Sequence, residues 1–390
     1  MRETPRHIFV IDVNTGGHHL TYIRLATEAF LRGDKKVIIL CPNSDTLQTT
    51  LNESGFHSVD YVEWKPPPYT RHLRRFLGPG LVRHCEIQRL IANYCKAHGI
   101  SDGNVGVFFP CFESFTVYGK LRCRLFELIA RYQYSGIVIG AAKRPGENLF
   151  PPFYRSNRVT AVHFLDEELV TEWNARGISK AHWIPDVSPT DLPDIEPPFC
   201  DEVRQFAKGR KIVLLYGHIN RRKRLPELVE LFETTPPNDA CLVVVGKLNL
   251  DAFSPQTRTR IEQLIRNGHP RILIRPGYIE RECDLNAIVN LADTLFAYYG
   301  TYSLSSNVLY KAAAFNKPVI VANAGLIGMR LRQHSIGHFA EDDSVPALAR
   351  TVTSTLATSY SRWDFKGYLR THSPTRWDTQ LAGSWKHIGS

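Results

Sequence analysis

The sequence predicts an α/β fold made of two Rossmann-like domains in tandem, and three observations support that prediction. Short, continuous apolar runs alternate with helical patterns over about the first 185 residues. A second series of the same kind starts near residue 211, and a proline-rich stretch separates the two series. Apolar runs of this kind are typical of parallel strands that are covered on both faces.

The first series opens with a strand, a glycine turn, a helix and a second strand. The turn contains Gly16 and Gly17, and the helix is predicted over 19–31. This turn is not a dinucleotide fingerprint, because the third glycine is missing and no acidic residue ends the second strand; NAD binding is therefore disfavoured. The strands expected in this domain lie at 7–13, 36–40, 105–110, 136–141, 159–165 and 181–185.

The second series follows a segment of linker composition, in which four prolines fall between residues 187 and 200. Ligands of parallel sheets bind beyond the carboxyl ends of the strands, and here two such edges can face one cleft. We therefore predict an N-terminal domain at 1–188, a linker at 189–208, a C-terminal domain at 209–358 and a tail at 359–390. The second domain should have strands at 211–217, 240–246, 271–277, 294–299 and 317–322.

The tail carries Trp363, Trp377 and Trp385 among polar residues. Such large aromatic side chains are expected to be buried. The tail is either a terminal helix that crosses back to the N-terminal domain or a loosely packed surface segment.

Composition limits the classes of partner and site. The formal net charge of +10 over 390 residues favours an anionic partner: nucleic acid, an acidic membrane surface or a phosphorylated ligand. The eight cysteines are scattered and no pair has C-x-x-C spacing, so we expect neither a zinc site nor a disulfide framework, and a reducing cytosol. The first apolar run breaks at Asp12, which excludes a signal peptide, and no run is long enough to span a membrane.

A basic insertion at 64–95 interrupts the alternation of strands and helices. It begins with three consecutive prolines and mixes arginines such as Arg71, Arg74 and Arg75 with Leu73 and Phe76. A basic, partly apolar segment of this kind can lie on an anionic bilayer. The alternative is a helical insertion with a solvated basic face. Nucleic-acid binding is disfavoured because no recognised module is present.

The loop after the first strand of the second series has the features of a phosphate-binding turn. The strand ends at Gly217, four consecutive cations follow at 221–224, and a helix opens with Pro226 in its first turn. Glycine lets the backbone come close, a helix N-terminus offers N–H groups, and cations pair with the anion. The alternative is a solvated basic turn of an ordinary βα unit.

The second half resembles the donor half of GT-B glycosyltransferases, and most closely family 4, whose members are retaining enzymes that use nucleotide sugars. The first half resembles them more loosely. The similarity lies in the order and spacing of the elements and in five segments: 217–223, 277–280, 292–293, 305–320 and 324–328.

The resemblance implies a role for each matching position. Arg222 and Lys223 would hold the donor diphosphate and stabilise the leaving group without a metal. The backbone at Tyr278 and Ile279 would contact the nucleobase. The expected donor-binding set also contains Gly16, Gly17, Gly217, Asn220, Gly246, Ser303, Ser305, Ser306, Asn307 and Lys311. We expect no cofactor besides the donor, a saccharide or lipid-linked acceptor, no nucleic acid, and a cytoplasmic protein that is peripheral at the inner face of the membrane.

One departure from the family concerns a pair of glutamates, whose places fall on Ser303 and Lys311. Serine cannot supply the negative charge of the first, and lysine cannot accept hydrogen bonds from ribose hydroxyls as the second would. Lysine could instead pair with a phosphate. Either the donor is held differently, or the chain belongs to a divergent branch, or activity has been lost.

The candidate catalytic residues of the first half are Glu113, His163 and His18 or its neighbour His19. All lie near a predicted strand end or the glycine turn, and each could instead be a structural residue. By family likeness, the acceptor hydroxyl would attack from the side of the leaving phosphate. Two rival functions stay open: a sugar-nucleotide epimerase on the same two-domain plan, and a catalytically silent nucleotide-sugar-binding protein.

Overall fold

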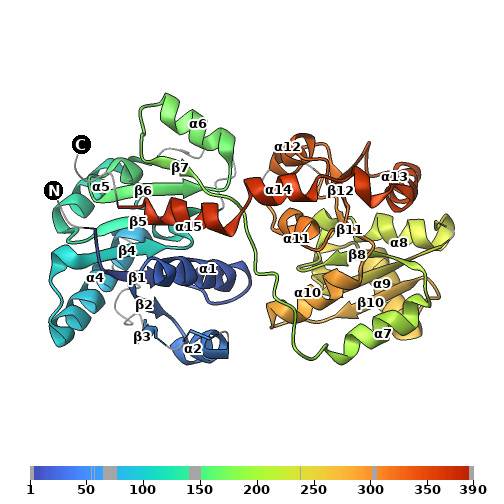
Figure 1. Ribbon diagram of the computed structural model, residues 1–390, viewed down its shortest axis with the longest axis horizontal. Coiled ribbons are helices and arrows are strands. Elements are labelled where there is room, and N and C mark those ends of the chain that lie inside the picture. Colours follow the sequence, from blue (N-terminus) through green and yellow to red (C-terminus); the bar gives the residue numbers. More distant parts are fainter. Residues whose placement is uncertain are drawn as a thin grey trace. The chain divides into compact units, whose positions relative to one another are not determined.

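The computed structural model describes residues 4–53, 55–56, 58–64, 77–139, 151–237, 239–300 and 305–385. Internal contacts divide the chain into two units, which Figure 1 shows. Unit 1 consists of Met1–Pro185 and Ser373–Ser390, and unit 2 consists of Asp186–His372. Each unit is built on one parallel sheet, so the predicted α/β class with two Rossmann-like domains is confirmed.

Unit 1 contains a seven-stranded sheet in the order β3-β2-β1-β4-β5-β6-β7. Every pair of neighbouring strands is parallel. The strands are β1 (His7–Ile11), β2 (Lys36–Cys41), β3 (Asp60–Glu63), β4 (Val105–Phe109), β5 (Gln133–Val138), β6 (Val159–Phe164) and β7 (Ala181–Trp183). The helices are α1 (His18–Arg32), α2 (Ser44–Glu53), α4 (Pro79–His98), α5 (Lys120–Ile129), α6 (Glu167–Ala175) and α15 (Pro374–Ala382), with short 3₁₀ turns η1 (Asp102–Asn104), η2 (Phe112–Phe115) and η3 (Pro152–Arg155).

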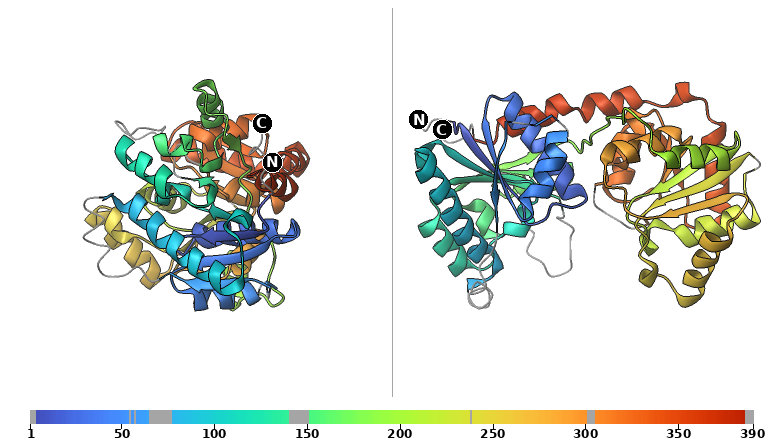
Figure 2. Two further views of the ribbon diagram at one scale, coloured as in Figure 1. Left: turned by 90° about the vertical axis from the view of Figure 1, so that its left-hand side faces the viewer. Right: turned by 90° about the horizontal axis from the view of Figure 1, so that it is seen from below.

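Both faces of the first sheet are covered, as the apolar runs predicted. On one face Phe9 and Ile11 of β1 join a core that includes residues of α4, α5 and α6. On the other face α1 and α15 pack together (Figure 2). Phe30 of α1 contacts Trp385. Trp377 and Trp385 are both buried.

Unit 2 contains a six-stranded parallel sheet in the order β10-β9-β8-β11-β12-β13. Its strands are β8 (Lys211–Tyr216), β9 (Ala240–Gly246), β10 (Ile272–Pro276), β11 (Thr294–Ala297), β12 (Val319–Ala322) and β13 (Gly337–Ala340). Its helices are α7 (Pro198–Ala207), α8 (Leu225–Thr234), α9 (Pro255–Asn267), α10 (Glu282–Leu291), α11 (Val308–Ala314), α12 (Gly325–Gln333), α13 (Val345–Ala357) and α14 (Phe365–Thr371), with 3₁₀ turns η4 (Arg221–Lys223), η5 (Leu250–Ala252) and η6 (Tyr360–Arg362).

Helices also cover the second sheet on both faces. One core joins β8, β9 and β12 to apolar residues of α8, α9 and α13. On the other face α10 contacts α7 and α11, and α11 contacts α14. The range 189–208, predicted as a linker, therefore includes a packed helix, α7, whose Cys200 and Val203 are buried.

The tail is divided between the units. Its helix α14 packs on α11 of unit 2, and its helix α15 packs on α1 of unit 1. Among the described residues, we find no helix with the length and apolar character needed to cross a membrane.

Candidate donor site

The order of strands in unit 2 reverses between β8 and β11, and ligands of such sheets bind outside the carboxyl ends of the strands at this reversal. Two glycines close the neighbouring strands β8 and β9 there. A Cβ on Gly246 would lie 2.0 Å from the carbonyl oxygen of Gly217, so only glycine permits this approach of the two backbones. Gly217 itself has φ of 94°, in the left-handed region.

Lys223 lies at this reversal and is buried. Its ammonium donates a hydrogen bond to the carbonyl oxygen of Tyr216 and stands 5.1 Å from the ring centroid of Tyr299. A Cβ on Gly217 would lie 3.2 Å from the lysine nitrogen, so the glycine makes room for the charge. Burial, and then the charge of Arg222, lower the pKa of Lys223 to about 7. The alternative of a solvated cation does not hold for Lys223.

The loop that carries Lys223 is organised by its own side chains. The Asn220 side chain accepts a hydrogen bond from the backbone N–H of Arg222 at 3.1 Å, and the Asn220 carbonyl accepts one from the N–H of Lys223 at 3.0 Å. Arg222 is exposed and its guanidinium lies 5.9 Å from the ring centroid of Tyr299. Asn220 therefore positions both predicted phosphate ligands.

A hollow of about 310 Å³ lies beside the ends of β9 and β10. The predicted nucleobase contacts Tyr278 and Ile279 line it, and Tyr278 is exposed. Phe199 of α7 and Arg275 close it from the side, with the guanidinium 5.0 Å from the Phe199 ring centroid. An apolar ring and a planar cation suit a flat heterocycle.

Lys311 does not face a donor phosphate. It is fully buried, and its ammonium bonds to the carboxylate of Glu282 and, at 2.6 Å, to the side-chain oxygen of Asn286. The amide of Asn286 in turn donates to the carbonyls of Pro189 and Asp191. Burial lowers the pKa of Lys311, and Glu282 opposes that shift. The suggestion that Lys311 pairs with a phosphate is corrected: its partner is a carboxylate of the same unit.

The side chain of Ser305 is also hydrogen-bonded within unit 2. It donates to Asp186, and the guanidinium of Arg330 donates to it at 2.6 Å. Asp186 and Arg330 are both buried. This buried pair was missed by sequence reasoning, since the two residues are 144 positions apart and neither belongs to a motif.

Neighbouring positions add smaller contacts. Asn307 lies 3.5 Å from the hydroxyl of Ser188, and the hydroxyl of Ser306 bonds to Tyr299, which opposes the rise in the Tyr299 pKa that burial causes. Ser303 lies outside the described residues.

Unit 1 presents a second cluster where its own strand order reverses, between β1 and β4. Asp12 follows β1 and is buried, and both of its oxygens lie 3.0 Å from Nδ1 of His19. This hydrogen bond raises the pKa of His19, and the charges of Asp12 and Glu113 act in the same direction. Asp12, His19 and Cys111 place one ligand-type atom each within 4.8 Å of one another, so these three could hold a metal ion.

The other predicted residues of unit 1 lie in different surroundings. Glu113 follows β4 and accepts a hydrogen bond from the N–H of Ile139. Gly16 donates its N–H to the side chain of Asn14, and Gly17 precedes α1 with φ of 60°. His19 lies at the cluster, where it bonds to Asp12. The side chain of His18 lies outside the described residues.

His163 is fully buried in unit 1, where its Nε2 lies 2.9 Å from the hydroxyl of Ser384. Burial lowers the pKa of His163 to about 3, so it stays neutral at physiological pH. It has no surface to offer a ligand, and we correct its predicted catalytic role to a packing role.

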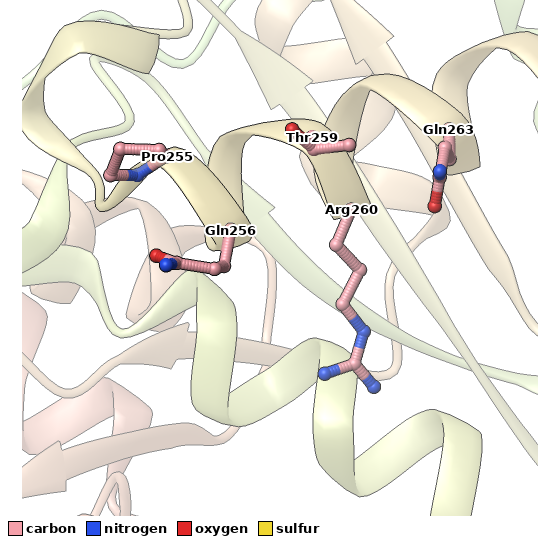
Figure 3. A pocket seen from close by; sticks show the side chains of 5 residues that line it. All are labelled: Pro255, Gln256, Thr259, Arg260 and Gln263. Atoms are coloured by element: carbon pink, nitrogen blue, oxygen red, sulfur yellow. The ribbon is translucent and has the colours of Figure 1, made fainter.

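A further hollow, of about 640 Å³, runs along α9 (Figure 3). Its lining side chains Pro255, Gln256, Thr259, Arg260 and Gln263 all come from that one helix. Arg260 forms an ion pair with Glu233 of α8. Groups from different elements do not converge there, so we assign it no ligand.

Comparison with known proteins supports the fold assignment. No family model matches the chain, and no curated protein matches it in sequence. Among solved structures, a glycosyltransferase from Rickettsia africae has a TM-score of 0.67 at 14% identity, covering 99% of both chains. Anabaena HepE, solved with UDP and glucose, has a TM-score of 0.64 at 15% identity, covering 98% of this chain and 99% of its own.

A structure described as a putative UDP-N-acetylglucosamine 2-epimerase from Listeria monocytogenes is also similar, with a TM-score of 0.61 at 12% identity over 97% of this chain and 94% of its own. The chain therefore has the GT-B fold, as the resemblance predicted. Membership of family 4 within that fold stays a prediction.

Proposed function

We propose that this protein is a glycosyltransferase that moves a hexosyl group from a nucleotide-sugar donor to a saccharide or lipid-linked acceptor. The observation that carries the proposal is the buried Lys223 at the strand reversal of unit 2, beside Arg222 and under two tyrosine rings. Fixed, desolvated donors of this kind stabilise the charge that develops on a departing diphosphate. The GT-B fold supports the same assignment.

In this proposal the diphosphate lies against Lys223 and Arg222, and the nucleobase occupies the hollow at Tyr278. The acceptor hydroxyl attacks the anomeric carbon, the bond from that carbon to the diphosphate breaks, and the hydroxyl proton passes to the departing phosphate oxygen. Retention follows from attack on the side of the leaving group. Because the two cations supply the positive charge, no metal is required for departure of the leaving group.

The absence of the family's paired glutamates is compatible with activity. The second glutamate position of the family falls on Lys311 of α11. Here Glu282 supplies a carboxylate from α10 at the same end of the sheet, and the ammonium of Lys311 binds that carboxylate. Its side chain is partly exposed, so it can still accept hydrogen bonds from a ligand. We propose that the donor is held by this rearranged set.

A panel of UDP-, GDP- and ADP-sugars, each with and without candidate acceptors, tests the proposal. We expect nucleotide release that depends on an acceptor, a product with the anomeric configuration of the donor by NMR, and full activity in EDTA. Loss of activity in EDTA, restored by one metal, would contradict metal independence. Asp12, His19 and Cys111 would then be the candidate ligands of that metal. Binding of donors without any turnover would overturn the transferase assignment.

The epimerase is the second candidate, favoured by the likeness to the Listeria structure. It would convert the sugar of the donor without any acceptor. The same panel distinguishes the two, because incubation of the donor alone then yields a second nucleotide sugar.

We also propose that the protein works at the inner face of the membrane as a peripheral protein. The basic segment 64–95 was the predicted contact, but residues 65–76 of it lie outside the described residues. In its described part, Arg89 is exposed, whereas Arg83 donates to the carbonyl of Ser114.

A further inference from the structure

Helix α5 of unit 1 carries large apolar side chains on the face that points away from the core. Leu121 is 71% exposed, Leu128 is 82% exposed and Ile129 is 38% exposed. Tyr118, just before the helix, is exposed as well. Half of the eight exposed large hydrophobic residues in the described part of the chain thus lie within twelve positions.

The placement of these residues follows from helical geometry. Cys123 and Phe126 of α5 are buried and define the inner face. Leu121 and Leu128 are seven positions apart, two turns, and project nearly opposite to that inner face. A surface helix normally places polar residues there. Burial in unit 1 therefore leaves an apolar ridge, Leu121 and Leu128, facing outward.

Cations flank the ridge on one side. Lys120 and Arg124 are exposed on the same side of the helix, and Arg131, which lies 3.8 Å from a carboxylate oxygen of Asp102, follows its end. The one acid of α5, Glu127, accepts a hydrogen bond from the N–H of Asn157, so it is occupied. The helix and its flanks, 118–131, hold four cations and one acid. Apolar side chains beside exposed cations match the acyl boundary and the anionic head groups of a bilayer.

We propose that α5 is a membrane-docking helix, which lies on an anionic bilayer with Leu121 and Leu128 inserted at the level of the head groups. Helix α5 follows η2, which contains Glu113 and comes after the carboxyl end of β4. Seating on lipid brings that end of the unit 1 sheet close to the head groups. The link between α5 and an acceptor rests on the proposed function, because a lipid-linked acceptor would present its sugar at the level of the head groups.

Co-sedimentation of the full chain with phospholipid vesicles tests the proposal. We expect binding to phosphatidylcholine vesicles that contain phosphatidylglycerol, little binding to phosphatidylcholine alone, and weakening as salt rises. The affinity of the double variant Leu121→Gln/Leu128→Gln for these vesicles should fall about tenfold or more, because two leucine side chains are no longer transferred from water into the bilayer. Lys120→Gln and Arg124→Gln should each weaken binding roughly fivefold.

Matched controls come from unit 2. Ile195 is 85% exposed but stands between Asp194 and Glu196, so Ile195→Gln should leave vesicle binding unchanged. Arg266→Gln removes an exposed helical cation of α9 and should also have no effect. Glutamine favours helix, and the replaced leucines make no core contact, so circular dichroism spectra should match the wild type.

Three results would overturn the proposal: equal binding of the wild type to neutral and anionic vesicles, no vesicle binding at all, or unchanged binding by the double leucine variant. If sedimentation velocity shows a dimer that the double variant abolishes, while vesicles bind neither protein, the ridge serves a second copy of the chain. Binding of UDP in the same samples separates this proposal from the donor site, since the α5 variants should bind UDP like the wild type.

Discussion

Two buried lysines of unit 2 differ in what surrounds them. Lys311 has a complete set of partners, because Glu282 supplies a carboxylate and Asn286 a side-chain oxygen. Lys223 has the carbonyl of Tyr216 and the faces of two tyrosine rings. Within the described part of the chain, no carboxylate forms an ion pair with Lys223.

We infer from this difference that Lys311 serves the fold, and we propose that Lys223 serves a ligand. A buried charge is costly unless it is paired, so a paired lysine adds specificity to packing, whereas an unpaired one is held ready for an anion. Burial, followed by the charge of Arg222, lowers the pKa of Lys223 to about 7. A diphosphate would complete its surroundings as Glu282 completes those of Lys311.

The largest effect is expected from breaking the completed pair. Glu282→Gln leaves the ammonium of Lys311 buried without its carboxylate and should lower the free energy of unfolding by about 2 kcal/mol, a value below that of a fully buried pair because Glu282 is partly exposed. Urea denaturation measures this change. Exposed Glu280 provides the control, and Glu280→Gln should stay within about 0.5 kcal/mol of the wild type. Equal stability of both variants would mean that the Lys311 pair is not structural.

The second effect concerns Lys223. Lys223→Met keeps the apolar stem and removes the charge, and we expect the affinity for UDP to fall tenfold or more, about 1.4 kcal/mol. Calorimetric titration measures the affinity, and circular dichroism verifies the fold. Arg221→Met, at the exposed first position of the same 3₁₀ turn, is the matched control with an expected loss below about twofold. Wild-type affinity in Lys223→Met would remove its phosphate role.

The sequence was informative wherever chemistry is local. The strand β8, the glycine that ends it and the cationic loop are contiguous, so their combination could be recognised from the order of residues alone. The partners that decide the roles are distant. Glu282 is 29 positions from Lys311, and Ser384, which bonds to His163, is 221 positions away. Composition and periodicity say nothing about such pairs, so the predicted roles of Lys311 and His163 could not be weighed from sequence.

Two strands were also missed, for physical reasons. β3 has four residues at the edge of its sheet, with an exposed first and last residue, so it lacks an apolar run. β13 begins at Gly337, where a Cβ would lie 1.9 Å from the carbonyl oxygen of Val319. Its glycine is required by the close approach of β12, which only the fold reveals.

The third effect is a pH dependence that only the unpaired lysine should cause. Lys223 loses its proton in the free protein as pH rises through about 7, whereas a bound diphosphate favours the protonated form and raises its pKa. UDP binding should therefore take up a proton above pH 7, and affinity should fall several-fold between about pH 7 and pH 9. Titrations in buffers of different ionisation enthalpy measure the uptake.

The same lysine also affects stability. Its pKa is lower in the folded state than in the unfolded chain, which binds more protons between about pH 7 and the ordinary lysine value. The free energy of unfolding should therefore rise with pH across that interval, and by less in Lys223→Met. A wild-type affinity for UDP that is flat with pH would contradict the role of an unpaired ammonium.

The smallest effect is expected at Arg222, which is exposed and therefore screened by solvent. Arg222→Gln should weaken UDP binding about threefold at low salt, and the difference should shrink in about 1 M salt, where the Debye length falls to about 3 Å. The loss in Lys223→Met should persist in high salt, because a buried charge is screened far less. If both variants responded to salt alike, burial would not distinguish the two cations, and the comparison of the buried lysines would lose its functional meaning.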